Sequence, residues 1–171
     1  MGTEGYERMK RFYEESEIGH QIAAPLVEGA TAIVEFDGDP ETYTLVKVKG
    51  RSVLKPGRPQ KADIYFRFSA GAINYLFEPP TADAADYVNR LCDCLLETDP
   101  GKKVEFKLLQ SLVTGWRKGY IAMMKLGGPR AISTVAKVGI RIPAKFLKDD
   151  RRNGAEQGAE NTGFAKMEVF F

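Results

Sequence analysis

Apolar and polar residues follow a helical period at the start of this chain and a strand period from residue 31 onward. Residues 4–18 carry aromatic and apolar side chains near helical spacing, which predicts a first helix, and residues 18–26 either continue it or form another. Strands are expected where β-branched and aromatic residues alternate between turn clusters, at 31–36, 42–49, 52–54, 63–68 and 103–109. In the fourth of these strands, Ile64, Phe66 and Phe68 share one face, and Tyr65 and Arg67 share the other.

Helices are predicted on either side of the last strand. Ser69 and Thr81 are suitable N-cap residues for helices at 70–77 and 81–97. A further helix is expected within 112–126, and Pro129 favours the start of another that reaches about residue 138. Together these elements indicate a small α/β domain.

The segment 119–126 is unusually apolar and contains two methionines. It follows Trp116, Arg117 and Lys118. On a helix, Trp116, Tyr120 and Met123 lie on one face, with Met124 beside it. Such a stripe is typical of an ordinary core, but methionine side chains also adapt to varied apolar guests, so a ligand pocket is the other interpretation.

Composition predicts one domain in a cytoplasmic protein. The chain has 171 residues, 43% of them hydrophobic and 28% charged, and no apolar run approaches the roughly 20 residues of a membrane span. The polar, acidic N-terminus does not resemble a secretory signal. We expect a single domain at 1–148 and a flexible tail at 149–171 that ends in an apolar, strand-like segment.

The small net charge of +2 hides an uneven distribution. Residues 1–98 carry 11 Lys and Arg against 16 Asp and Glu, whereas residues 99–152 carry 13 against 4. A basic second half could contact a membrane surface transiently, or it could be a solvated basic face. Since no nucleic-acid-binding module is recognisable, no nucleic-acid partner is expected.

The residue types that carry catalysis or bind metals are scarce. His20 is the one histidine, and Cys92 and Cys94 are two residues apart, which on a helix places them about 200° apart. We therefore expect a reduced setting without a disulfide, no metal site, no cofactor and no catalytic residue. An enzyme that uses Asp63, Tyr65 or Glu105 is the least favoured interpretation, because no pairing of titratable groups supports it.

The order of the predicted elements resembles the sterol carrier protein type-two (SCP-2-like) family over residues 4–127. The resemblance is carried by Ala62-Asp63-Ile64-Tyr65-Phe66-Arg67-Phe68-Ser69 and by Gly119-Tyr120-Ile121-Ala122-Met123-Met124-Lys125-Leu126. It implies an α+β fold in which helices cover a five-stranded, mostly antiparallel sheet and enclose an apolar cavity. The order of elements departs from that family in two places. Residues 110–118 lengthen the link between the last strand and the apolar segment, and the helix at 81–97 is longer than is typical of the family.

The resemblance further implies a lipid carrier that is not an enzyme. Its ligand would be a fatty acid, acyl-CoA, sterol or similar lipid, with Arg117, Lys118 and Lys125 meeting a carboxylate or phosphate at the cavity mouth. The alternative is an interaction module that uses the same apolar helix as the interface of a homodimer or with another partner. The residues expected to line or border the cavity are Phe66, Phe68, Leu76, Leu95, Phe106, Leu108, Trp116, Tyr120, Met123 and Met124.

Overall fold

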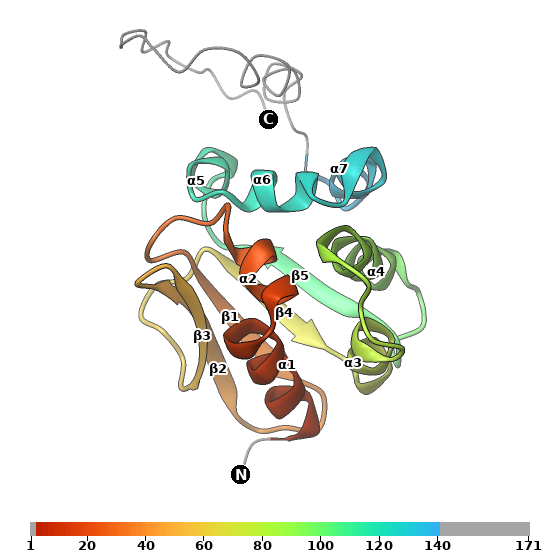
Figure 1. The fold of residues 1–171 in the computed structure, drawn as a ribbon. Helices are drawn as coiled ribbons and strands as arrows, with labels where there is room; N and C mark the ends of the chain where they lie inside the picture. Colours follow the sequence, from red (N-terminus) through yellow and green to blue (C-terminus); the bar gives the residue numbers. More distant parts are fainter. Residues whose placement is uncertain (1–2, 141–171) are drawn as a thin grey trace, which may run out of the picture. The chain divides into compact units, whose positions relative to one another are not determined.

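The computed structural model describes residues 3–140, and this part of the chain contains five strands and seven helices (Figure 1). The strands are β1 (Thr31–Phe36), β2 (Thr42–Val48), β3 (Arg51–Pro56), β4 (Ile64–Phe68) and β5 (Val104–Leu108). The helices are α1 (Glu4–Glu15), α2 (Glu17–Ala23), α3 (Ala70–Phe77), α4 (Ala84–Leu96), α5 (Leu112–Arg117), α6 (Tyr120–Lys125) and α7 (Gly128–Lys137).

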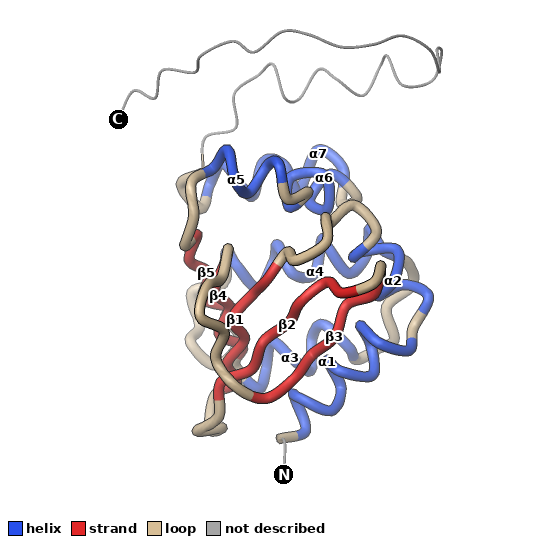
Figure 2. The backbone as a smooth tube through the Cα atoms, turned by 90° about the vertical axis from the view of Figure 1, so that its left-hand side faces the viewer, coloured by secondary structure: helices blue, strands red, loops and turns tan. Residues whose placement is uncertain are grey.

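The five strands form one mixed sheet in the order β3-β2-β1-β4-β5. The central pair β1–β4 is parallel, and the other neighbouring pairs are antiparallel. Helices lie against one face of this sheet (Figure 2). The predicted fold class, a mostly antiparallel five-stranded sheet covered by helices, is confirmed. The predicted tail at 149–171 lies outside the described residues.

The two faces of β4 differ as the alternation predicts. Ile64 and Phe68 are buried toward the helices. On the opposite face, the Tyr65 hydroxyl donates a hydrogen bond to Glu35 over 2.8 Å, and the Arg67 Nε donates one to Asp37 over 2.7 Å. The apolar face of the sheet is therefore available to build an interior with the helices.

The expected first helix at 4–18 is interrupted at Ser16. This residue ends α1 in an extended conformation, and its hydroxyl accepts a hydrogen bond from Gly19 N at the start of α2. Gly19 lies inside α2 rather than interrupting it. A Cβ at Gly19 would come within 2.1 Å of the Phe12 carbonyl oxygen, so glycine lets the two helices approach closely.

The helices α3 and α4 differ in how well their starts were predicted. Ser69 caps α3 as expected, since its hydroxyl accepts a hydrogen bond from Ala72 N. By contrast, α4 begins three residues later than expected, because the Asp83 carboxylate, rather than Thr81, caps it by accepting from Asp86 N. The Thr81 hydroxyl instead donates to the Leu76 carbonyl.

The segment predicted as one helix within 112–126 forms two. Gly119 separates α5 from α6 and has φ 88°, in the left-handed region that favours glycine. A Cβ at this position would lie 2.0 Å from the Pro25 carbonyl oxygen. The Lys118 carbonyl accepts a hydrogen bond from Val27 N, which ties this break to the loop after α2. The break therefore sets where α6 lies over the sheet.

Substitution of Gly119 by alanine is expected to destabilise the protein by at least about 2 kcal/mol, because the new Cβ meets both a positive φ and a backbone carbonyl. Gly115→Ala is the matched control on α5, since its Cβ would meet Leu108 at an ordinary 3.7 Å. This control should be neutral or stabilising by up to about 1 kcal/mol. Urea unfolding of both variants tests this, and equal stabilities would contradict it.

Candidate functional site: two adjoining apolar cavities

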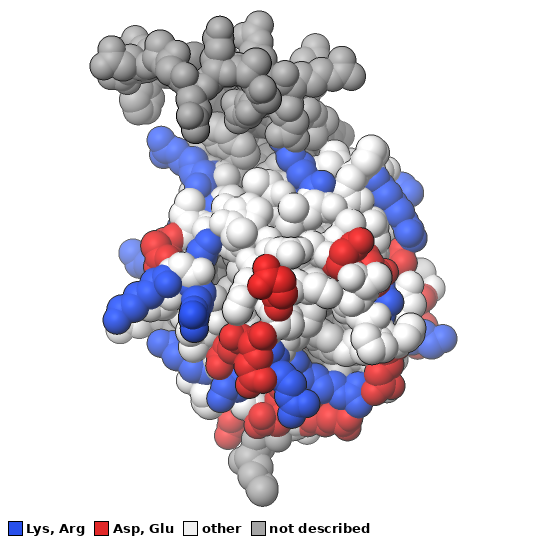
Figure 3. Space-filling view, viewed as in Figure 1, with Lys and Arg blue, Asp and Glu red and all other residues white. Residues whose placement is uncertain are grey.

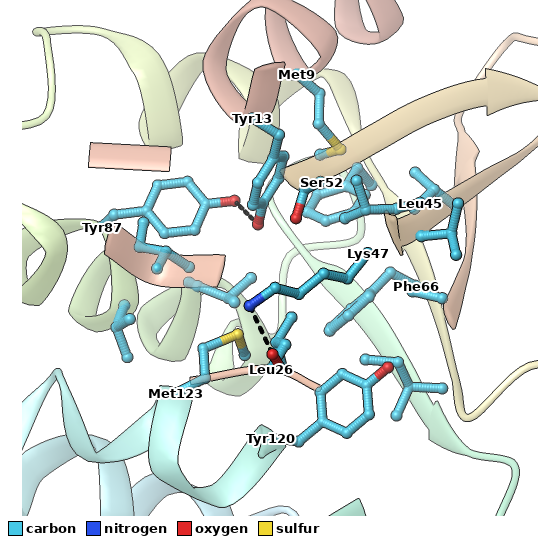
Figure 4. Close-up of a pocket in the computed structure, with 18 residues that line it drawn as sticks. Met9, Tyr13, Leu26, Leu45, Lys47, Ser52, Phe66, Tyr87, Tyr120 and Met123 are labelled. Carbon is cyan, nitrogen blue, oxygen red and sulfur yellow. Dashed lines mark hydrogen bonds between the residues drawn. The ribbon is translucent and has the colours of Figure 1, made fainter. Parts of the chain in front are cut away.

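Two small cavities lie between the apolar face of the sheet and the helices. The first has a volume of about 40 Å³ and is drawn in Figure 4. The second has a volume of about 60 Å³ and lies among β4, β5, α4 and the α5–α7 region. Both are lined by a common set of side chains, so they adjoin each other. The shared residues are Ile64, Phe66, Leu91, Tyr120 and Met123.

Each element contributes to the shared wall through its own periodicity. Phe66 projects from the middle of β4, where its ring lies 5.3 Å from that of Phe106, its partner on β5. Leu91 comes from the buried face of α4. Tyr120 and Met123 are three residues apart on α6 and so lie on one helix face. The wall between the cavities thus consists of side chains from three separate elements.

The cavities are too small for a long-chain ligand as they stand. Sites for drug-sized ligands usually enclose roughly 300–1,000 Å³, several times the volume of either cavity. Side chains must move for such a ligand to enter. Met123 lines both cavities and Met124 the second, and unbranched methionine side chains adapt readily to new neighbours. The shared wall is therefore the natural place for the two cavities to merge.

A buried carboxylate holds α6 against the sheet. Asp63, at the start of β4, is 3% exposed and accepts hydrogen bonds from the Thr31 N, the Lys118 Nζ and the Tyr120 hydroxyl over 2.8, 2.8 and 3.1 Å. Burial, followed by the Asp63 charge, raises the pKa of Tyr120. The Tyr120 phenol therefore remains protonated at neutral pH and keeps donating to Asp63.

Two tyrosine hydroxyls meet in the first cavity. The oxygens of Tyr13 and Tyr87 lie 3.1 Å apart, one donating to the other (Figure 4). Burial raises the pKa of Tyr13 to about 12, and burial together with the neighbouring Tyr13 raises that of Tyr87. Phe12 stacks on Tyr87 with ring centroids 4.6 Å apart. The pair links α1 to α4 as neutral hydroxyls.

Lys47 is the charged residue of the first cavity, and the sequence interpretation missed it. Its ammonium donates to the carbonyls of Ala23, Ala24 and Leu26, over 2.9, 3.0 and 2.6 Å, at the C-terminal end of α2. The signal was present in the alternation of β2, since Tyr43, Leu45 and Lys47 share one face.

Other lining residues that were not predicted include Met9, Tyr13, Ile22, Ser52 and Tyr87 of the first cavity and Leu112, Ile121, Val135, Val138 and Ile140 of the second.

The structure brings most of the predicted cavity residues together. Phe66, Tyr120 and Met123 line both cavities, Phe68 lines the first, and the second is lined also by Leu95, Phe106, Leu108 and Met124. Leu76 is fully buried but borders neither cavity.

Trp116, which was expected to line or border the cavity, and the three cations expected at its mouth are in neither lining. Trp116 is 42% exposed, and Arg117 is exposed as well. Lys118 is engaged with buried Asp63, and Lys125 is half-buried at the end of α6. None of these four lines either cavity. The break at Gly119 explains this for α5, because it ends the helix on which Trp116 and Tyr120 would share a face.

His20 and the two cysteines are not among the residues that line the cavities. The His20 ring is hydrogen-bonded through Nε2 to the Glu14 carbonyl at 3.1 Å. Cys92 and Cys94 are buried free thiols, and burial raises the pKa of Cys94 to about 12. Between residues 3 and 140, no group of three or more His, Cys, Asp or Glu side chains is placed to hold a metal ion.

Charged residues gather unevenly on the face seen in Figure 3. Acidic and basic side chains mix over its lower part, whereas Lys and Arg side chains lie near the top, around α5, α6 and α7. Their contact with a membrane surface stays a prediction. None of the helices in the described part of the chain is long and apolar enough to cross a bilayer.

Comparisons with known proteins find similarity in structure and none in sequence. No family model matches the sequence, and no curated protein matches it. The fold is similar to a solved structure described as "UbiJ-SCP2 Ubiquinone synthesis protein", with a TM-score of 0.42 and 15% sequence identity. The match covers 74% of this chain and 95% of that one. A likeness of this degree transfers no ligand or activity.

Replacing Lys118 by methionine is expected to destabilise the protein by about 3 kcal/mol, because it leaves the buried Asp63 carboxylate without its cation. Arg117→Met is the matched control, since it removes an exposed cation from the adjacent position. Its effect should stay within about 0.5 kcal/mol. Chemical unfolding measures both, and a Lys118 variant as stable as the control would show that the ion pair contributes little.

The buried tyrosine pair predicts a loss of stability at alkaline pH. A raised pKa in the folded state means that stability is complete below the unfolded value of about 10 and falls as the pH rises toward about 12. Tyr13→Phe should cost about 1 kcal/mol at pH 8 and show a shallower fall between about pH 8 and 11. Urea unfolding at both pH values tests this, and an unchanged pH dependence would refute it.

Proposed function

We propose that this chain binds an apolar or amphipathic small molecule between its sheet and its helices. The ligand class is a fatty acid, acyl-CoA, sterol or similar lipid. The observation that carries the proposal is the pair of adjoining cavities, whose common wall contains Phe66, Tyr120 and Met123. Among the described residues that line the second cavity none is charged, and the hydroxyl of Tyr120 in this lining is bonded to Asp63.

The energetics favour a ligand with a long hydrocarbon chain. Each methylene transferred from water contributes about 0.8 kcal/mol, so a long chain offsets the cost of displacing several side chains. The soft residues at the wall keep that cost low, because methionine changes rotamer without moving the backbone. A rigid, fully packed wall of β-branched residues would resist the same change.

Binding without catalysis fits the groups that surround the cavities. The Tyr13, Tyr87 and Tyr120 phenols stay protonated at neutral pH, because burial raises the pKa of each. Cys94 is a poor nucleophile for the same reason. The Tyr13 and Tyr87 hydroxyls bond to each other and the Tyr120 hydroxyl bonds to Asp63, so the three phenols hold elements together.

The alternative, in which the apolar helix is a dimer interface, is less well supported. The apolar residues Tyr120, Ile121, Met123 and Met124 of α6 are each less than 10% exposed within one chain. A side chain already buried in this way offers little further area to a partner. The stripe is therefore better suited to a ligand inside the domain than to a second protein outside it.

A charge placed in the shared wall tests the proposal. Met123→Asp should reduce binding of a fluorescent fatty acid at least tenfold, because the carboxylate faces both cavities. Ala122→Asp places the same charge on the exposed side of the same helix and should bind like the wild type. Native mass spectrometry of the purified wild type should in addition show a small molecule that is lost on denaturation.

A second variant separates a binding defect from a folding defect. Gly115→Val adds only apolar volume to the lining of the second cavity, where Leu108 is the nearest neighbour at 3.7 Å. It should weaken binding of the longest chains most while the protein keeps its circular dichroism spectrum. If Met123→Asp folds and binds the probe as the wild type does, the cavity is not the binding site.

A further inference from the structure

Lys47 places a positive charge inside the domain without a carboxylate to neutralise it. The residue is 8% exposed, and its ammonium contacts only the three carbonyl oxygens at the end of α2. Among the described residues, no Asp or Glu forms an ion pair with it. The end of a helix supplies only about half a negative charge, so an excess of positive charge remains beside the cavity.

Ser52 places a hydroxyl beside this charge. It lies directly opposite Lys47 in the antiparallel β2–β3 pair, which places the two side chains next to each other on the same face of the sheet. It is 2% exposed and lines the first cavity, so its side chain borders the space beside Lys47. A serine hydroxyl can donate a hydrogen bond to a carboxylate oxygen.

The two adjoining cavities differ in polarity, and the first is the polar one. Lys47, Ser52 and the Tyr13–Tyr87 pair all line the first cavity, and Figure 4 shows Lys47 reaching across it toward the Leu26 carbonyl. The second cavity is lined by apolar side chains and by Tyr120, whose hydroxyl is bonded to Asp63. A volume of about 40 Å³ favours a compact head group over a bulky one.

We propose that Lys47 and Ser52 bind the carboxylate of a fatty acid whose hydrocarbon tail occupies the second cavity. This inference rests on the proposed function and specifies its ligand class and orientation. The carboxylate accepts a hydrogen bond from the Ser52 hydroxyl and replaces one of the carbonyls around the Lys47 ammonium. The tail passes the wall at Phe66, Tyr120 and Met123. The acid group therefore enters first and lies deep, instead of remaining at the mouth.

The other cations near the cavities are less suitable for this role. Lys118 is already neutralised by Asp63. Arg117 is exposed, where water screens its charge. Lys47 alone among these three lines a cavity. A carboxylate beside it would neutralise a charge that the protein leaves uncompensated.

Two probes with the same chain, palmitate and hexadecanol, test the head-group assignment at pH 8. The wild type should bind palmitate at least about tenfold more tightly, as a charge-assisted hydrogen bond implies. Lys47→Met should abolish this preference while hexadecanol binds as before, and Ser52→Ala should reduce the preference in part. Lys55→Met removes an exposed lysine from β3 and should leave the preference intact.

The outcomes separate this inference from the function on which it rests. If neither probe binds, both are wrong. If both bind equally well to the wild type, or if the Lys47 variant keeps the preference, the cavity binds lipid but the carboxylate site is refuted. If Lys47→Met fails to fold, two other variants test the carboxylate site through the preference for palmitate over hexadecanol. Lys47→Arg retains the positive charge, and Ser52→Ala leaves the lysine in place.

Discussion

The hydrogen bonds of the Asp63 carboxylate determine how the helical cover meets the sheet. One carboxylate receives a backbone N–H from the start of β1, an ammonium from Lys118 at the end of α5, and a hydroxyl from Tyr120 at the start of α6. A buried carboxylate is tolerated only when such donors surround it. The left-handed turn at Gly119 separates Lys118 from Tyr120, and both side chains reach the same carboxylate. The position of α6, and with it the shared cavity wall, depends on this cluster.

The cavity wall combines firm anchoring at its ends with adaptable side chains at its centre. Tyr120 is held by its hydroxyl, whereas Met123, one turn further along α6, is held only by packing. Phe66 is flanked by the rings of Phe68 and Phe106 at 5.7 and 5.3 Å, which leaves it free to tilt within an aromatic row. A ligand can therefore join the two cavities by displacing side chains while the backbone remains in place.

The sequence predicted the sheet well because its strands have one polar and one apolar face. The first strand was placed at its observed bounds, and the alternation in β4 identified Phe66 and Phe68. The sequence allowed a second helix after the first but did not place the break at Ser16, where the serine hydroxyl caps α2. It missed the break at Gly119, which depends on close approach to the distant Pro25 carbonyl. Placing Trp116 in the cavity followed from treating residues 112–126 as one helix. Lys47 was missed because a lysine in a strand is usually assigned to the solvent face.

The contrast between the two buried charges underlies the difference in polarity between the two cavities. Asp63 is fully neutralised by donors from three segments, so it adds stability without adding polarity to the cavities. The Lys47 ammonium, by contrast, is hydrogen-bonded only to neutral backbone carbonyls at the end of α2. A glycine cap or water could satisfy those carbonyls without burying a charge. A methionine in place of Lys47 would fill the same volume without the desolvation penalty of an ammonium. Helix capping alone does not require a lysine at this position. The buried ammonium is best explained by a further acceptor, the carboxylate of a ligand. The Ser52 hydroxyl beside it offers that carboxylate a second donor.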